Sequence, residues 1–189
     1  QIEHCPKSLL YGNGINLQQA ARSFRRKFFE AWTAKSDQHV VLLAHHSDDQ
    51  VETFFTQLAR GAGIFGLGGM LDEKRQIIRP FLSIPKSALE EFAKKEGISW
   101  REDRSNKSTN YLRNRFRNVF LPVLERENPD LRKSVLILQA AFRQEQEIIL
   151  SSIQDLLNDW EEEQQILLDK WKALSFEQKL AFTKVAGFE

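Results

Sequence analysis

Cysteine is almost absent from this 189-residue sequence, in which Cys5 is the only one. A single cysteine cannot form a disulfide within the chain, and it cannot supply a thiolate-rich zinc or iron–sulfur site. We expect Cys5 to be a thiol without a special role.

Long apolar runs are missing as well. No stretch approaches the roughly 18 apolar residues that would span a membrane. The first ten residues, QIEHCPKSLL, have neither the basic end nor the apolar core of a signal peptide. With 41% hydrophobic residues, the chain can still bury one sizeable core and part of a second. We therefore expect a soluble, cytoplasmic and globular protein with no membrane partner.

An initiating methionine is also missing, because the sequence begins with Gln1. We expect that a segment upstream of this residue has been lost or left out.

The net charge of +1 conceals an uneven distribution along the chain. Residues 143–165 contain seven acidic residues and one arginine, so this segment would repel nucleic acid. Between residues 100 and 120, six basic residues outnumber the acidic Glu102 and Asp103, which predicts a phosphate-binding surface near the middle of the chain. The basic residues are Arg101, Arg104, Lys107, Arg113, Arg115 and Arg117.

Helix, strand and helix are predicted in this order in the first third of the chain. Apolar residues recur on one helical face over residues 17–31. The short run VVLLA at residues 40–44 is typical of a strand that is buried on both faces of a parallel sheet. Ser47 and Gln50 have the spacing of a capping box and predict a helix that runs through Leu58. This order indicates an α/β domain.

The next segment contains two prolines and a predicted helix. Residues 77–82 are expected to form a strand or an extended segment, with Pro80 favouring a sheet edge. Pro85 suits the first turn of a helix, and Gly97 suits the cap at its end. We expect this helix to pack through Leu89, Phe92 and Ala93.

The second half of the chain is predicted to be helical. A helix over residues 110–118 should continue irregularly, because Pro122 cannot donate the hydrogen bond that a helix interior needs. Apolar residues then recur every three or four positions over residues 131–163, which predicts one long helix or two helices broken near Ser151 and Ser152. Ser175 and Gln178 have the spacing of a capping box and predict one more helix, which begins after Ser175.

The stretch HHSDDQVET at residues 45–53 is the most informative part of the sequence, since it lies where a strand should lead into a helix. Ligands bind at that junction in open α/β sheets. Asp48, Asp49 and Glu52 can converge within the first turns of one helix, where they could hold Mg²⁺ or a substrate ammonium group. The alternative is that the aspartates only cap the helix.

Other stretches carry weaker signals. His45 and His46 point in opposite directions as they leave a strand, so we exclude a shared zinc ion. RGAGIFGLGGM at residues 60–70 could expose backbone amides to a phosphate, but a flexible connection is the favoured interpretation. WREDRSN at residues 100–106 could position RNA or a catalytic loop, although turn formation is the simpler explanation.

Arg113 and Arg117 share one helix face in the basic segment, with Asn114 beside them. Paired guanidinium groups at this spacing suit phosphates. A solvated basic face, or pairing with carboxylates such as Glu102 or Asp103, is the competing explanation.

Together these motifs resemble the tRNA(Ile)-lysidine synthases. HHSDDQVET, RGAGIFGLGGM, IIRPFL, WREDRSN and YLRNRFRNVFLPVLE occur in the order and approximate spacing of that family, over residues 16–125. The segment GINLQQAARSFRRKFF also resembles an arginine-bearing helix of the family, with Arg22 and Arg25 matching. It departs at Gln18 and Arg26, where the family often has Glu and Tyr.

The resemblance implies a fold and an activity. The fold would be a partial parallel-sheet nucleotide-binding domain of the adenine nucleotide alpha hydrolase type at residues 1–130, followed by a long helix and the start of a helical second domain at 131–189. The activity would use ATP and Mg²⁺ to adenylate the wobble cytidine of a tRNA(Ile) with a CAU anticodon, after which free L-lysine displaces AMP. The lysine amine must first lose a proton, since its reference pKa is about 10.4.

The resemblance also implies site residues in this sequence. Asp49 and Glu52 would be catalytic and bind lysine, with Asp48 as a substrate or Mg²⁺ contact. Arg60 and Gly61 would lie in a loop near the substrate.

Further residues would bind the nucleotide and the tRNA. His45 would face the ATP site at the end of the strand. Arg22 and Arg25 would contact either the phosphates of ATP or the tRNA. The tRNA backbone or the loop architecture would be held by Arg113, Asn114 and Arg117.

The sequence departs from the family in one important respect: it contains no S-G-G-x-D-S pyrophosphate loop, whose family position would precede Gln1. Without those backbone amides ATP has no evident cradle, so we expect the 189-residue chain to be inactive alone. Two alternatives stay open. One is a related tRNA thiolase, which should bring more cysteines, and the other is a tRNA-binding or scaffold chain without catalysis.

Overall fold

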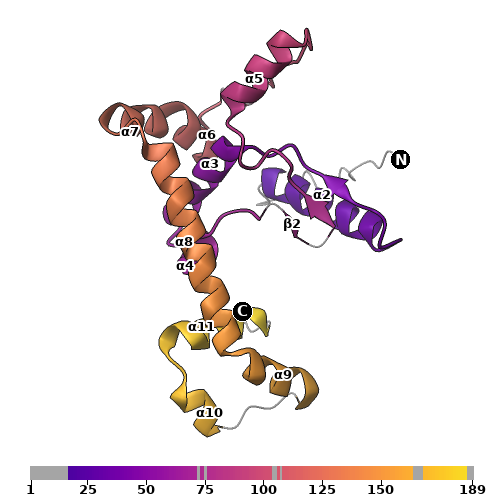
Figure 1. Cartoon of the computed structure of the whole chain (residues 1–189), viewed down its shortest axis with the longest axis vertical. Coiled ribbons are helices and arrows are strands. Elements are labelled where there is room, and N and C mark those ends of the chain that lie inside the picture. The colour runs from indigo at the N-terminus through magenta and orange to yellow at the C-terminus, as the bar shows by residue number, and fades with distance from the viewer. Residues whose placement is uncertain are drawn as a thin grey trace. The chain divides into compact units, whose positions relative to one another are not determined.

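The computed structural model describes residues 17–71, 73–74, 76–103, 106, 108–163 and 168–186 (Figure 1). Cys5 and the first residues of the resemblance lie outside the described residues. The chain divides into two compact units, the first at residues 1–45 and 71–83 and the second at 46–70 and 84–189. Among the described residues, none of the helices combines the length and apolar character needed to cross a lipid bilayer.

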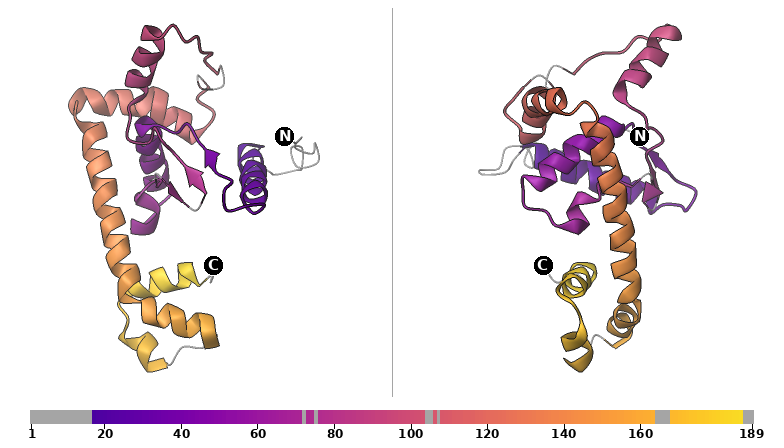
Figure 2. Two further views of the ribbon diagram at one scale, coloured as in Figure 1. Left: turned by 45° about the vertical axis from the view of Figure 1, so that its right-hand side comes forward. Right: turned by 60° about the vertical axis from the view of Figure 1, so that its left-hand side comes forward.

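The first unit contains helix α2 (Leu17–Thr33) and a small sheet, which can be followed in Figure 2. Its strands are β1 (Val41–Leu42), β2 (Glu73–Lys74) and β3 (Ile77–Ile78), in the order β1-β3-β2. β1 runs parallel to β3, as expected for an α/β domain, whereas β2 is antiparallel to β3.

Two expectations about this sheet are wrong. Val40 and Leu42 are 50% and 65% exposed, so the strand is not buried on both faces. Within the described residues β1 pairs on one side only, and it is too short to present a continuous apolar face. Pro80 does not mark a sheet edge either: β3 is the central strand and ends at Ile78, before the residue that cannot donate to a ladder.

The second unit is helical over its described residues (Figure 1). The α-helices and the π-helix η2 have these bounds: α3 Ser47–Leu58, α4 Ile64–Leu67, α5 Lys86–Lys95, α6 Leu112–Arg115, η2 Phe116–Phe120, α7 Leu121–Glu127, α8 Leu131–Ser152, α9 Gln154–Glu163, α10 Leu168–Ala173 and α11 Phe176–Val185.

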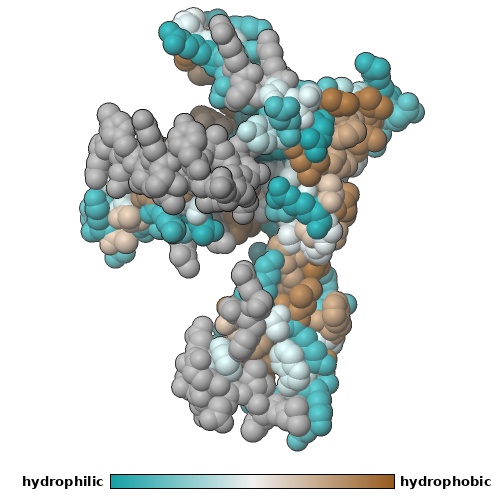
Figure 3. All heavy atoms as spheres, turned by 180° about the vertical axis from the view of Figure 1, so that it is seen from behind, coloured by the Kyte–Doolittle hydropathy of each residue, from teal (hydrophilic) through white to brown (hydrophobic). Residues whose placement is uncertain are grey.

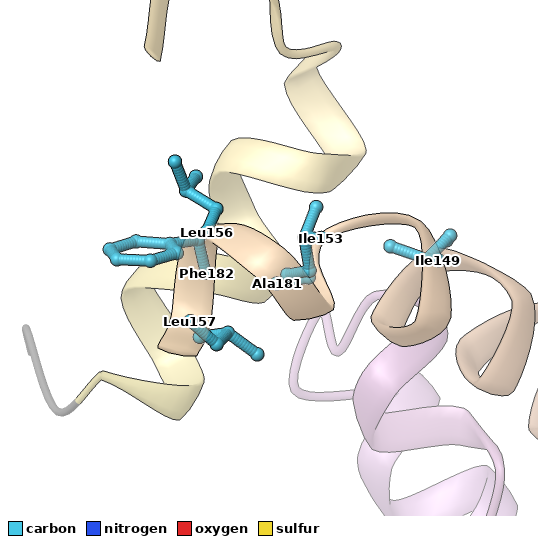
Figure 4. Close-up of a cluster of buried hydrophobic side chains, with 6 residues drawn as sticks. All are labelled: Ile149, Ile153, Leu156, Leu157, Ala181 and Phe182. Atoms are coloured by element: carbon cyan, nitrogen blue, oxygen red, sulfur yellow. The ribbon is translucent and has the colours of Figure 1, made fainter. Parts of the chain in front are cut away.

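Two apolar clusters hold this unit together. The first combines α3, α4, α7 and α8 through Val51, Phe54, Leu67, Leu121 and Val135. The second joins the end of α8 to α9 and α11 (Figure 4), and its member Phe182 is 1% exposed. Its buried members are Ile149, Ile153, Leu156, Leu157, Ala181 and Phe182.

Helix α8 contributes to both clusters and begins at Leu131, where we expected a domain boundary. Since Val135 packs in the same cluster as Val51, the boundary at residue 130 stays a prediction. The predicted break near Ser151 and Ser152 is confirmed, because α8 ends at Ser152. The predicted cap of α11 is confirmed as well, through Ser175 and Gln178.

Helices α7 and α8 also expose large apolar side chains. Val123, Ile137 and Ile148 are each more than half exposed. Figure 3 shows apolar surface along this side of the second unit. One side of α8 is buried in the two clusters, and its solvent-exposed side is also apolar.

The irregular helix expected before Pro122 is confirmed. Residues 116–120 form the π-helix η2, and the Leu121 N–H donates to the Phe116 carbonyl, five residues back. A wider helical turn at this point accommodates a proline that cannot donate to the carbonyl four residues before it.

Helix α5 departs from its predicted packing. Pro85 is its N-cap and Gly97, with φ of 65°, follows its end, so the predicted bounds are nearly correct. However, no residue of α5 is buried, and Phe92 is 59% exposed. The apolar face that the sequence shows has no buried contact within the described part of the chain.

Candidate functional site

The site begins at the N-terminus of α3. His46 is the N-cap, and its backbone N–H donates to Asp49 Oδ2 at 3.0 Å. Asp48 and Asp49 lie in the first turn, where the helix dipole favours their ionised forms. The cap that we predicted at Ser47 and Gln50 is one residue too late, because Ser47 is already helical.

Two arginines pair with the acidic face of α3. Arg113 Nε donates to Glu52 Oε2 at 2.8 Å, and its Nη2 donates to Asp49 Oδ1 at 2.5 Å. Arg117 holds Glu52 with two hydrogen bonds, Nε to Oε1 at 2.5 Å and Nη2 to Oε2 at 2.8 Å. Glu52 is only 2% exposed. Such charge-assisted contacts are stronger than neutral hydrogen bonds and fix the direction of both partners.

The helix pair α6 and η2 brings these arginines to α3. Arg113 and Arg117 are four residues apart, and both pair with carboxylates of α3. Phe116 between them packs against Phe55 of α3, with the ring centroids 5.7 Å apart and the rings tilted by 31°. Burial opposes the charge of Arg117, but the hydrogen bond and charge of Glu52 raise its pKa above the ordinary value. Of the competing explanations, pairing with carboxylates is therefore what the structure shows, although the partners are not Glu102 or Asp103.

Asp48, the third carboxylate of the site, has partners from three elements. Its Oδ2 accepts from the backbone N–H of Lys86 at 2.8 Å and lies 3.5 Å from His46 Nδ1, and its Oδ1 pairs with Arg132. His46, the Lys86 N–H and Arg132 hold the pKa of Asp48 well below its ordinary value, against the effect of burial. Arg132 also binds Glu125 through Nε at 2.6 Å.

This arrangement bears on Mg²⁺. Carboxylate oxygens are the ligands that Mg²⁺ prefers, so the residue types at Asp48, Asp49 and Glu52 are suitable. Their oxygens, however, already accept hydrogen bonds from arginines and backbone amides. Among the described residues no group of three His, Cys, Asp or Glu side chains is placed to hold a metal ion. The site as folded does not fit Mg²⁺, and we assign no step to it.

A pocket of about 510 Å³ lies beside the paired charges. It is large enough for an amino acid side chain, and it is lined by groups of both charges, by amides and by an exposed tryptophan. The lining residues are His46, Asp48, Glu52, Lys86, Trp100, Arg101, Glu102, Asp103, Asn106, Arg117, Asn118 and Arg132.

The glycine-rich segment is held from two sides. The Gln50 amide makes two 2.7 Å hydrogen bonds to the backbone of Met70, one to its carbonyl and one from its N–H. From α8, Arg143 donates to the Gly68 carbonyl and Gln146 to the Ile64 carbonyl, both at 2.7 Å. A flexible connection is therefore the wrong interpretation for residues 64–70.

Gly69 combines a left-handed backbone conformation with little room for a side chain. Gly69 has φ of 78°, and an added Cβ would lie 2.5 Å from the Gln139 amide and 2.6 Å from Gln50. We expect Gly69→Ala to destabilise the protein by about 1–3 kcal/mol, because both the backbone conformation and the contact oppose it. Urea unfolding measures this, and Gly63→Ala, where an added Cβ meets nothing within 4 Å, is the matched control.

The remaining predicted residues are spread over the chain. Arg60 and Gly61 are exposed at the start of the glycine-rich segment, and Asn114 is partly buried in α6. His45, Arg22 and Arg25 belong to the other compact unit, where the two arginines are exposed on α2. The predicted site residues that lie close together in the structure are Asp48, Asp49, Glu52, Arg113 and Arg117.

The 100–106 stretch is described at residues 100–103 and 106 only, and there a hydrogen bond that spans three residues is consistent with the predicted turn. The Asn106 N–H donates to the Asp103 carbonyl at 3.1 Å, and the Asn118 amide donates to the Asn106 carbonyl at 2.8 Å. Trp100 and Asn106 line the pocket beside the acidic residues. Arg104 and Lys107 lie outside the described residues.

Comparison with known proteins shows to which family the chain is similar. A family model described as a PP-loop domain matches residues 1–124. Among curated proteins, the tRNA(Ile)-lysidine synthase of Bacillus subtilis (strain 168) is 40% identical over 149 residues, 77% of this chain and 32% of that protein. The protein of the same name from Legionella pneumophila (strain Lens) is 33% identical over 185 residues, 94% of this chain and 42% of that protein.

A third relative named tRNA(Ile)-lysidine synthase, from Streptococcus thermophilus (strain CNRZ 1066), is 42% identical over 126 residues, which are 64% of this chain and 28% of that protein. The chain thus spans 28% to 42% of the length of these relatives.

Proposed function

The chain belongs to the PP-loop family of ATP-binding domains, and from this premise we propose that it is part of an enzyme that converts the wobble cytidine of tRNA(Ile) to lysidine. The C2 oxygen of the cytidine would attack the α-phosphate of ATP and release pyrophosphate, and the adenylated oxygen is then a good leaving group. The amine of free L-lysine would then attack C2 and release AMP. The observation that carries the proposal is the similarity to tRNA(Ile)-lysidine synthases of three genera over 64% to 94% of this chain.

The carboxylates of α3 supply what the second step requires. Lysine arrives largely as an ammonium ion, which Asp49 and Glu52 would attract, and one of them would accept its proton before attack. Both carboxylates are now paired with Arg113 and Arg117, so the ammonium must take the place of a guanidinium group or share a carboxylate with it. Asp48, whose two oxygens already have donors, would hold the start of α3 in position.

Other residues would serve the nucleotide and the tRNA. ATP supplies the adenylyl group when it is bound, and His45, Arg22 and Arg25 are the proposed contacts in the first unit. Arg60 and Gly61 would approach the substrate from the exposed start of the glycine-rich segment.

Arg113, Asn114 and Arg117 had two predicted roles, contact with tRNA and support of the loop architecture. The ion pairs with Asp49 and Glu52 support the architectural role. Contact with phosphates is compatible with it, because the side chains of Arg113 and Arg117 remain 34% and 30% exposed.

A lysine incorporation assay tests the function. A chain extended upstream to include an S-G-G-x-D-S loop is expected to transfer labelled lysine to tRNA(Ile) with a CAU anticodon in the presence of ATP. The 189-residue chain alone is expected to transfer none, because the backbone amides that hold the pyrophosphate are missing from it.

The control substrate is the same tRNA with uridine in place of the wobble cytidine. Absence of transfer by a folded, extended chain would sink the enzyme assignment, and tRNA binding without transfer would favour a non-catalytic tRNA-binding protein. Transfer by the 189-residue chain would overturn the expected inactivity.

A further inference from the structure

The acidic pair of α3 has no free oxygen. Asp49 Oδ1 accepts from Arg113 and Oδ2 from the His46 backbone N–H. Glu52 Oε1 accepts from Arg117, and Oε2 accepts from both arginines at 2.8 Å. A lysine ammonium that binds these carboxylates must therefore displace a guanidinium group or share an oxygen with it.

The two sides of the ion pairs differ in exposure. The side chains of Glu52 and Asp49 are 3% and 11% exposed, whereas those of Arg113 and Arg117 are 34% and 30% exposed. Arg117 lines the pocket together with Glu52. The guanidinium groups therefore present more side-chain surface to a ligand from solvent than the carboxylates do. The ligand that a planar guanidinium group binds best is a carboxylate or a phosphate.

We propose that Arg113 and Arg117 are a gate on the carboxylate pair, which opens when phosphate groups bind the arginines and so frees Asp49 and Glu52 for the ammonium of lysine. The proposal rests on the proposed function, and it names how that site is regulated. The phosphate comes from the tRNA backbone or from ATP, and the experiment below separates these two sources.

The energetics make the two ligands depend on each other. Removing a guanidinium group from Glu52 leaves a buried carboxylate without its partner, which is strongly unfavourable. If phosphate alone binds, the carboxylate stays unpaired, and if lysine alone binds, the displaced guanidinium group loses its partner. When both bind, every charge has a partner again. Lysine and the phosphate ligand should therefore bind cooperatively, each raising the affinity of the other by the same factor.

The test measures lysine affinity in the complete protein as it is expressed from its gene. Equilibrium dialysis with labelled lysine is carried out without a second ligand, with tRNA(Ile) bearing the CAU anticodon, and with a non-hydrolysable ATP analogue. We expect the phosphate ligand that opens the gate to tighten lysine binding at least about fivefold. The arm that shows this effect identifies the source of the phosphate, and lysine must tighten binding of that ligand equally.

Two variants separate a gate from a purely structural ion pair. Arg117→Gln leaves Arg113 on Glu52 and is expected to raise lysine affinity in the absence of tRNA and ATP toward the value of the fully liganded wild type. The coupling factor should fall toward one. Arg115→Gln is the matched control, because Arg115 lies on the same helical segment but donates to the carbonyl oxygens of Thr109 and Asn110. It should keep the wild-type coupling factor.

The outcomes distinguish this inference from the proposed function. A wild-type protein that binds lysine equally well in all three arms overturns the gate and leaves the function standing. A wild-type protein that binds tRNA but no lysine under any condition overturns both. The coupling between lysine and the phosphate ligand is measured first in the wild type. The proposal can therefore be contradicted even if a variant fails to fold.

Discussion

Simultaneous replacement of Arg113 and Arg117 by methionine is expected to lower the free energy of unfolding by about 3–5 kcal/mol. Glu52, which is 2% exposed, would lose both of its charged partners and remain buried as an uncompensated carboxylate. In a chain of this size the loss corresponds to a fall in melting temperature of roughly 6–20 °C. Urea unfolding and calorimetry measure the two quantities independently.

The control is a triple variant that also carries Glu52→Met. Replacing a buried ion pair by apolar side chains of similar volume is often neutral, so this variant should regain the part of the lost stability that comes from Glu52, whereas Asp49 stays without its arginine partners. Arg115→Met, which removes contacts to two backbone carbonyls only, should cost less than about 1 kcal/mol. A double variant as stable as the wild type would show that the ion pairs contribute little to folding.

Neutralising either acidic residue of the pair is expected to separate the two half-reactions. In a chain extended upstream with the S-G-G-x-D-S loop, Asp49→Asn or Glu52→Gln should slow lysine transfer on the order of a hundredfold, because the group that attracts the ammonium and accepts its proton is gone. Adenylation of the tRNA should change much less. Single-turnover assays with labelled ATP and labelled lysine measure each step separately.

Asp155→Asn on α9 is a suitable control, because Asp155 is an exposed acidic residue outside the site. Equal loss of adenylation and lysine transfer would point to a folding role for Asp49 and Glu52. Unchanged lysine kinetics would remove both residues from the site.

Local signals predicted the helical elements well. The bounds of α3, the irregular helix before Pro122 and the cap at Ser175 each depend on residues only a few positions apart, so the sequence contains all the information needed. The exposure of Leu42 and Phe92 could not be predicted in this way, because burial depends on which elements pack on a face, and apolar periodicity only shows which face is available.

Long-range pairing explains what sequence reasoning missed in the site. The sequence identified Asp49, Glu52, Arg113 and Arg117 as candidates, but it assigned them to two separate sites. In the structure they form ion pairs between residues that are 61 to 65 positions apart in the chain. Arg132 was missed altogether. The residues next to Arg132 in the sequence do not indicate that it pairs with Asp48, which lies 84 positions earlier.

These separations also matter while the chain is being synthesised. Asp48, Asp49 and Glu52 leave the ribosome 61 to 84 residues ahead of the arginines that neutralise them. At the usual rates of translation this interval lasts roughly 3 to 17 s. During that time three like charges crowd the first turns of a nascent helix, and Val135, which completes its apolar cluster, has not yet been made. Folding of α3 into its final environment must therefore wait for the ribosome to pass the beginning of α8.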